Sequence, residues 1–110
     1  MNQTDLEKYI SSLGAVVKDT QLKPGLIVFK NPANDKIFAV LKDGASPLRL
    51  EVKTDTRLSK HLRTKYESVL LSQNMSKKDW IEILCTGQLT DEEVKDLIRL
   101  SYDLVASATE

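Results

Sequence analysis

The chain is poor in the residues that build disulfide-bonded or metal-bound scaffolds. Among its 110 residues there are one cysteine and one histidine. A lone cysteine cannot form an internal disulfide, which fits a reducing compartment. One histidine and one cysteine also cannot supply the ligands of a closed zinc site. The sequence therefore predicts a protein without a cofactor, whose fold depends on packing alone.

Long apolar runs are missing as well. No apolar stretch approaches the ~20 residues that a membrane span needs, and the N-terminus, MNQTDLEKY, has acids where a signal peptide has an apolar region. Hydrophobic residues make up 41% of the chain and charged residues 29%, as in ordinary soluble domains. We therefore expect one cytoplasmic domain over residues 1–110, with no membrane association.

Signatures of enzymatic chemistry are also absent. The sequence has no nucleophile elbow, phosphate loop or dinucleotide fingerprint. His61 stands among cations that disfavour its charged form, and Cys85 ends an apolar segment with nothing adjacent to activate it. The acidic run at residues 91–93 is explained by helix capping, because negative side chains stabilise the positive end of the helix dipole. The sequence thus predicts a protein that is not an enzyme.

The chain has no net charge, but its charge is unevenly distributed. Residues 36–80 contain ten Lys/Arg and five Asp/Glu, and the remaining residues carry the opposite excess. A neutral total gives no general attraction to nucleic acid, whereas a one-sided distribution can make one face basic. The alternative is that these charges scatter over a solvated surface of mixed sign, which is the usual arrangement.

Capping patterns predict a helix at each end of the chain. Thr4 with Glu7 fits a capping box, and the apolar stripe that follows ends at Gly14. Thr90 with Glu93 fits a second box, and the apolar stripe after it predicts the core face of a last helix. That face consists of Val94, Leu97, Ile98, Tyr102 and Val105.

Apolar and β-branched segments predict strands between these helices. Residues 26–30, 36–41 and 48–53 are joined by short turns, which indicates an antiparallel meander. In the third segment Arg49, Glu51 and Lys53 alternate with apolar residues, so we expect them on a wet face.

A middle helix should begin near Thr54 or Asp55, with Leu58, Leu62 and Tyr66 as a narrow apolar seam. Residues 69–71 and 80–85 are two further expected strands. The order predicts an α+β domain: an antiparallel β-sheet of about five strands with helices packed on one face.

Several segments together carry a resemblance. They are the strands 36–41 and 48–53, the turn 74–80, and Ser101-Tyr102-Asp103-Leu104-Val105 in the last helix. On these segments the chain resembles the MmcQ/YjbR family, small bacterial proteins with a frataxin-like (CyaY-like) α+β fold. The pair Lys77-Lys78 before Trp80 is the most specific match. Asp79 stands where the family usually has His, and only Pro24-Gly25 matches its aromatic-Gly pair.

The family is commonly labelled DNA-binding, so the resemblance implies double-stranded DNA as a partner. Lys and Arg contact phosphate without reading sequence. Few aromatics, 5% of the chain, leave no stacking platform for single strands. For the lysine pair, the alternative is a solvated turn before Trp80, which we expect to anchor the core. The candidate phosphate contacts are Arg49, Lys53, Arg57, Lys60, Arg63, Lys65, Lys77 and Lys78.

Two further functions stay open. In one, the chain is a non-enzymatic protein-interaction module, whose sheet edge or helix 57–66 holds a partner and whose basic face meets an acidic protein. In the other, a small molecule binds in a pocket between sheet and helices. Nothing in the sequence indicates an oligomeric state.

Overall fold

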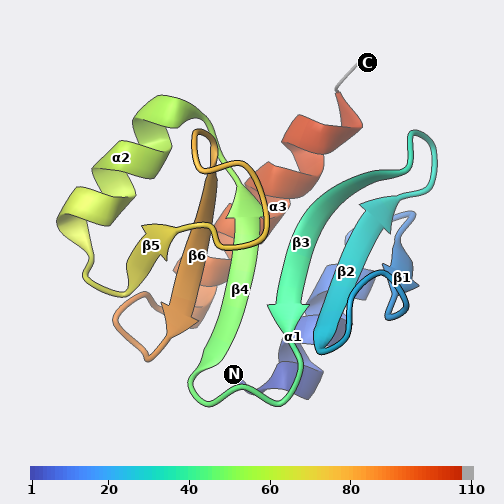
Figure 1. Cartoon of the computed structure of the whole chain (residues 1–110), viewed down its shortest axis with the longest axis horizontal. Coiled ribbons are helices and arrows are strands. Elements are labelled where there is room, and N and C mark those ends of the chain that lie inside the picture. Colours follow the sequence, from blue (N-terminus) through green and yellow to red (C-terminus); the bar gives the residue numbers. More distant parts are fainter. Residues whose placement is uncertain (108–110) are drawn as a thin grey trace.

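Six strands form one antiparallel sheet in the computed structural model, which describes residues 1–107. Their spatial order is β1-β2-β3-β4-β6-β5 (Figure 1). The strands are β1 (Val17–Asp19), β2 (Leu26–Asn31), β3 (Lys36–Lys42), β4 (Leu48–Lys53), β5 (Val69–Leu71) and β6 (Trp80–Cys85). The predicted α+β class and antiparallel sheet are confirmed. The count of about five strands missed β1, whose three residues are mostly polar and show no alternation.

The helices are α1 (Gln3–Ser11), α2 (Thr56–Lys65) and α3 (Asp91–Ala106). Asp55 caps α2 and the predicted capping box starts α3, as expected. The predicted start of α1 is wrong, because Asn2 is the N-cap and forms a box with Asp5. Asparagine is a strong N-cap residue, and here it stands two positions before Thr4. Glu7 instead pairs with Lys18 at 2.7 Å.

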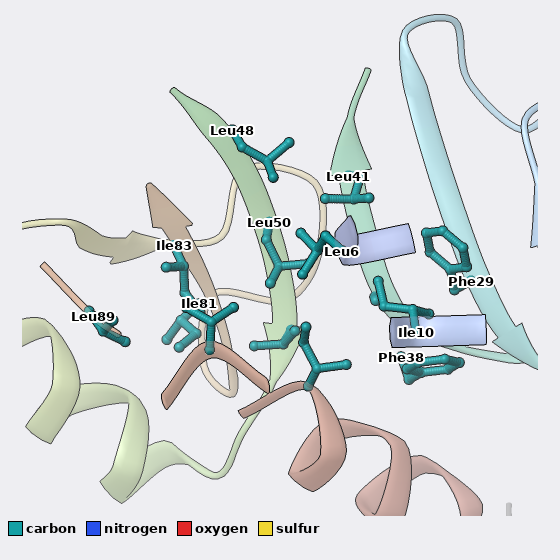
Figure 2. Packing of buried hydrophobic residues seen from close by; sticks show 14 of the residues in the cluster. Leu6, Ile10, Phe29, Phe38, Leu41, Leu48, Leu50, Ile81, Ile83 and Leu89 are labelled. Carbon is teal, nitrogen blue, oxygen red and sulfur yellow. The ribbon is translucent and has the colours of Figure 1, made fainter. Parts of the chain in front are cut away.

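The core lies between the sheet and its helices. Side chains of α1 and α3 pack onto β2, β3, β4 and β6, and Leu62 of α2 joins the same cluster (Figure 2). Burying each large apolar side chain contributes about 1.5–3 kcal/mol, which makes this layer the main source of stability. Its fully buried members include Leu6, Ile10, Phe29, Phe38, Leu41, Leu50, Ile81, Ile83 and Ile98.

Ser101 fastens α3 to the sheet. Its hydroxyl donates to the carbonyl of Phe38 at 2.6 Å and accepts the backbone N–H of Lys53 at 2.8 Å. Ser101 is fully buried, so both bonds replace contacts with water. One small polar side chain thus fixes the helix against two neighbouring strands.

The other face of the sheet has no helix over it. In Figure 1 the loop between β5 and β6 passes in front of β4 and β6, whereas α1 and α3 lie behind the sheet. One row on this open face runs in register across five strands, through Val28, Val40, Glu51, Glu82 and Leu70. Apolar side chains therefore occupy both ends of the row, and two adjacent carboxylates lie between them.

The prediction that Arg49, Glu51 and Lys53 lie on a solvent-exposed face of β4 is wrong, because a loop covers this face. Glu51 is only 3% exposed, and Arg49 and Lys53 are half-buried. Alternation placed these side chains on the side away from the helices, but the loop of residues 72–79 covers that side. Within residues 1–107, no helix has the length and apolar character needed to cross a membrane.

Candidate nucleic-acid interface

The helix α2 presents the densest group of cations. Its apolar side faces the core through Leu62, with Leu58 and Tyr66 partly buried against the same cluster, as the predicted seam requires. Three of its four Lys/Arg residues are exposed, and residues 56–65 contain no Asp or Glu. The exposed cations are Arg57, Lys60 and Lys65.

Two of the α2 cations also have contacts within the helix. Arg63 is half-buried, and its Nε donates to the Ser59 hydroxyl at 3.2 Å. The Lys65 ammonium lies 5.2 Å from the centroid of the Tyr66 ring, a cation–π distance. Neither of these two contacts neutralises the charge of the side chain.

The turn that precedes β6 lies beside the start of α2. Thr54 donates to the carbonyl of Asp79 from its backbone N–H at 2.6 Å and from its hydroxyl at 3.2 Å. The backbone N–H of Trp80 donates to the carbonyl of Ser76 at 3.1 Å, which closes the turn. The exposed side chain of Lys78 therefore lies on a segment next to the first turn of α2.

The two lysines of the pair differ in their surroundings. The Lys77 ammonium donates to the backbone carbonyl of Ser72 at 2.6 Å, so it holds the loop of residues 72–79 together. Lys78 is exposed, and its side chain has no hydrogen bond or ion pair with any residue from 1 to 107. The Lys78 ammonium is therefore free of internal contacts, whereas the Lys77 ammonium is held in place by one hydrogen bond.

Two other predicted contacts are neutralised by carboxylates. Arg49 pairs with Glu82 at 3.2 Å, and Lys53 pairs with Asp79 at 3.6 Å. The partners come from β6 and from the turn before it, about 30 residues along the chain. Six of the eight candidates have no carboxylate within ion-pair distance in the described part of the chain: Arg57, Lys60, Arg63, Lys65, Lys77 and Lys78.

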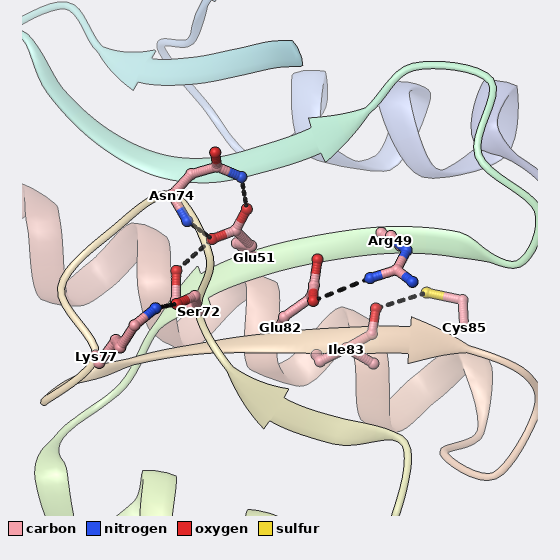
Figure 3. A network of polar contacts seen from close by, with 8 residues as sticks. All are labelled: Arg49, Glu51, Ser72, Asn74, Lys77, Glu82, Ile83 and Cys85. Carbon is pink, nitrogen blue, oxygen red and sulfur yellow. Dashed lines mark hydrogen bonds and ion pairs between the residues drawn. The ribbon is translucent and has the colours of Figure 1, made fainter. Parts of the chain in front are cut away.

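Sequence reasoning missed the buried carboxylates beneath the loop. Glu51 accepts hydrogen bonds from the Ser72 hydroxyl, from the Asn74 backbone N–H at 3.0 Å and from the Asn74 side-chain amide (Figure 3). Glu82, its cross-strand partner, is 2% exposed, and among residues 1–107 its side chain accepts a hydrogen bond from Arg49 alone. Burial raises the pKa of Glu82, and its neighbour Glu51 raises it further, whereas Arg49 opposes the shift. In the sequence, the position of Glu82 between Ile81 and Ile83 was the feature that could have indicated a buried carboxylate.

The remaining sequence candidates are Trp80, Cys85 and the possible metal ligands. Trp80 is 4% exposed, which confirms that it is buried, but its register with Lys53 places it on the helix-free face and not in the cluster between sheet and helices. Burial raises the pKa of Cys85 to about 11, so its thiol is a poor nucleophile at neutral pH. Among residues 1–107, no three His, Cys, Asp or Glu side chains come together in a way that could hold a metal ion.

Comparison with known proteins gives a consistent fold and family. The family model described as YjbR matches residues 11–104. A Deinococcus radiodurans protein with a DUF419 domain superposes with a TM-score of 0.89 at 24% identity, over 97% of this chain and 80% of that one. A Pseudomonas syringae protein superposes with a TM-score of 0.82 at 26% identity, over 96% and 99%. No curated protein matches the chain.

Proposed function

The chain belongs to the YjbR family, and on that premise we propose that it binds double-stranded DNA weakly and without sequence preference. The family membership confirms the resemblance inferred from the lysine pair and the last helix. The observation that supports DNA binding is the charge of α2. Its Arg57, Lys60 and Lys65 are exposed, and residues 56–65 contain no Asp or Glu. Lys78 on the adjoining turn adds a fourth exposed cation.

The residue types on this surface suit backbone contacts rather than base readout. Arg57 and Lys60 are three residues apart, so their Cβ atoms lie about 5–6 Å apart on one side of the helix. Residues 56–65 contain no Asn or Gln, the side chains that read adenine edges. Phosphate contacts position a protein on the duplex but carry no sequence information. The expected binding is therefore non-specific.

Four phosphate contacts set the expected salt dependence. Each neutralised phosphate releases counterions, so affinity falls with the logarithm of the salt concentration at a slope of about −0.9 per contact. Between ~50 and ~200 mM salt, four contacts reduce affinity roughly 100-fold. Anisotropy of a fluorescently labelled duplex measures this change.

A double variant tests whether α2 is the surface. We expect R57A/K60A to weaken duplex binding at low salt and to reduce the salt slope by about two contacts. The matched control is K8A/K36A, which removes two charges that lie on α1 and at the start of β3 and make no ion pair among residues 1–107. Absence of binding at ~50 mM salt, or equal loss in both double variants, would contradict the proposal.

A second candidate function is protein interaction at the β5 edge. Within the described part of the chain β5 pairs with β6 alone, and its Leu70 and Leu71 are 39% and 43% exposed. An exposed strand edge can accept a strand from another protein. A partner that co-purifies after nuclease treatment and is lost in Leu70→Lys would favour this function over DNA binding. A partner lost on nuclease treatment would favour the duplex.

A further inference from the structure

A cavity of about 450 Å3 opens on the helix-free face of the sheet. It lies between the segment before β2, the end of β3 and the loop that follows β5. Its lining includes no residue of α2. It combines cationic, acidic, amide and apolar groups, among them Lys23, Leu26, Lys42, Arg49, Asn74 and Glu82. The cavity is therefore distinct from the surface proposed for the duplex.

The cations of the lining have hydrogen-bond donors to spare. An arginine has five N–H donors and a lysine has three. Arg49 uses one nitrogen on Glu82, and Lys23 donates to the Asn74 side-chain oxygen at a long 3.3 Å. The Lys42 ammonium makes no hydrogen bond or ion pair with residues 1–107. The lining thus offers many more free donors than acceptors.

The carboxylates of the lining are already occupied. Glu51 accepts from Ser72 and Asn74, and Glu82 accepts from Arg49. Neither is well placed to take a cationic ligand, because each would have to give up an existing partner. The imbalance favours a ligand that supplies acceptor oxygens.

The ion pair with Glu82 holds the Arg49 guanidinium in one orientation. The carboxylate is 2% exposed on β6, and the guanidinium extends from β4 toward it (Figure 3). Burying a carboxylate is costly, and the ends of the same row of the sheet hold the apolar residues Val28, Val40 and Leu70, so packing alone does not require an acid there. A fixed guanidinium can present its remaining N–H groups as a planar fork to a carboxylate or phosphate.

We propose that this cavity binds a small organic anion through a carboxylate or phosphate group. Arg49, Lys42 and Lys23 contact the anionic group, and Leu26 packs against the carbon part of the ligand. Glu82 is a positioning residue that orients the Arg49 guanidinium. The recess lies partly under a loop, which suits a small molecule rather than a duplex.

Titration calorimetry with inorganic phosphate and with succinate tests the binding site. We expect saturable binding of at least one probe, with a Kd of about a millimolar for such small ligands. Lys42→Ala should weaken it about tenfold or more, the loss of one charge-assisted contact. Lys36→Ala is the control, because it removes a charge from the other end of β3, outside the cavity. Absence of saturation with both probes, or equal weakening in both variants, would overturn the proposal.

Glu82→Gln tests the positioning role by the sign of its effect. If Glu82 orients the guanidinium, binding weakens in Glu82→Gln, and the Arg49 side-chain N–H signals in the NMR spectrum exchange faster with water. If Glu82 only repels anions, binding becomes tighter, and the positioning role is overturned. Neither probe contains nucleic acid, so these outcomes stand whether or not the chain binds DNA.

Discussion

Glu51 is the side chain on which the loop of residues 72–79 depends. It is 3% exposed and receives the Ser72 hydroxyl and the backbone and side-chain N–H groups of Asn74. Replacing Glu51 with alanine leaves the fully buried Ser72 hydroxyl and the Asn74 backbone N–H without their acceptor. An orphaned buried donor costs about 1–3 kcal/mol. Removing the carboxylate also relieves its repulsion of Glu82. We therefore expect Glu51→Ala to lower the free energy of unfolding by about 2–3 kcal/mol.

Urea denaturation followed by Trp80 fluorescence measures this change. For a small domain the slope is about 1–3 kcal/mol/M, so the midpoint should fall by roughly 1–2 M. Glu67→Ala is the control, since Glu67 is exposed and makes no hydrogen bond or ion pair with residues 1–107. Hydrogen exchange should show faster opening of the backbone N–H groups of residues 72–79 in the Glu51 variant. Unchanged or raised stability of Glu51→Ala would refute the reasoning, and would mean that the buried acid costs more than its contacts return.

Three other predictions follow from contacts of single side chains. Lys77→Ala should lower the free energy of unfolding by about 1–2 kcal/mol in urea melts, because it removes the hydrogen bond to the Ser72 carbonyl. Lys78→Ala should change it by no more than about 0.5 kcal/mol. Equal effects of the two variants would contradict the view that Lys77 alone stabilises the loop. Ser101→Ala should cost about 2 kcal/mol and lower the Tm by roughly 10 °C in calorimetry, because two bonds between α3 and the sheet are lost; an unchanged Tm would count against it. The pKa of Glu82 is raised in the folded chain, so at pH values above the usual glutamate pKa the folded chain binds more protons than the unfolded chain. The contribution of Glu82 to stability therefore falls as the pH rises through its folded pKa. Stability of Glu82→Gln relative to the natural chain should therefore increase over that window, and a constant difference would show that Glu82 titrates normally.

The sequence predicted the fold well because its signals are local. The Thr90–Glu93 capping box, the seam of α2 and the apolar run from Trp80 each depend on residues within one or two turns. Such patterns arise from backbone hydrogen bonding and side-chain spacing, which act over short distances. β1 was not predicted, because its three mostly polar residues show no such pattern and become a strand through pairing with β2.

The site was predicted less well because its contacts join distant parts of the chain. A period of two says that Arg49, Glu51 and Lys53 share a face, but not whether water or a loop lies over it. The carboxylates that pair with two of the proposed phosphate contacts, Glu82 and Asp79, come from beyond α2 and β5. Cross-strand register decides these pairs, and register is a property of the folded sheet. The α2 cations needed no such information, since their helix turns them outward.

The position of β6 also governs how the chain can fold during synthesis. Among the strands of residues 1–107, β6 comes last in chain order, yet it lies between β4 and β5 and is the strand with which β5 pairs. Until residues 80–85 leave the ribosome, β2, β3 and β4 can pair as a meander, but β4 keeps a free edge and β5 has nothing to pair with. The pairing of Leu48 with Cys85 then closes a long segment of chain, and such non-local steps are slow. Glu51 acquires its cross-strand neighbour Glu82 only when β6 pairs with β4, so the edge of β4 stays open until residues 80–85 are available.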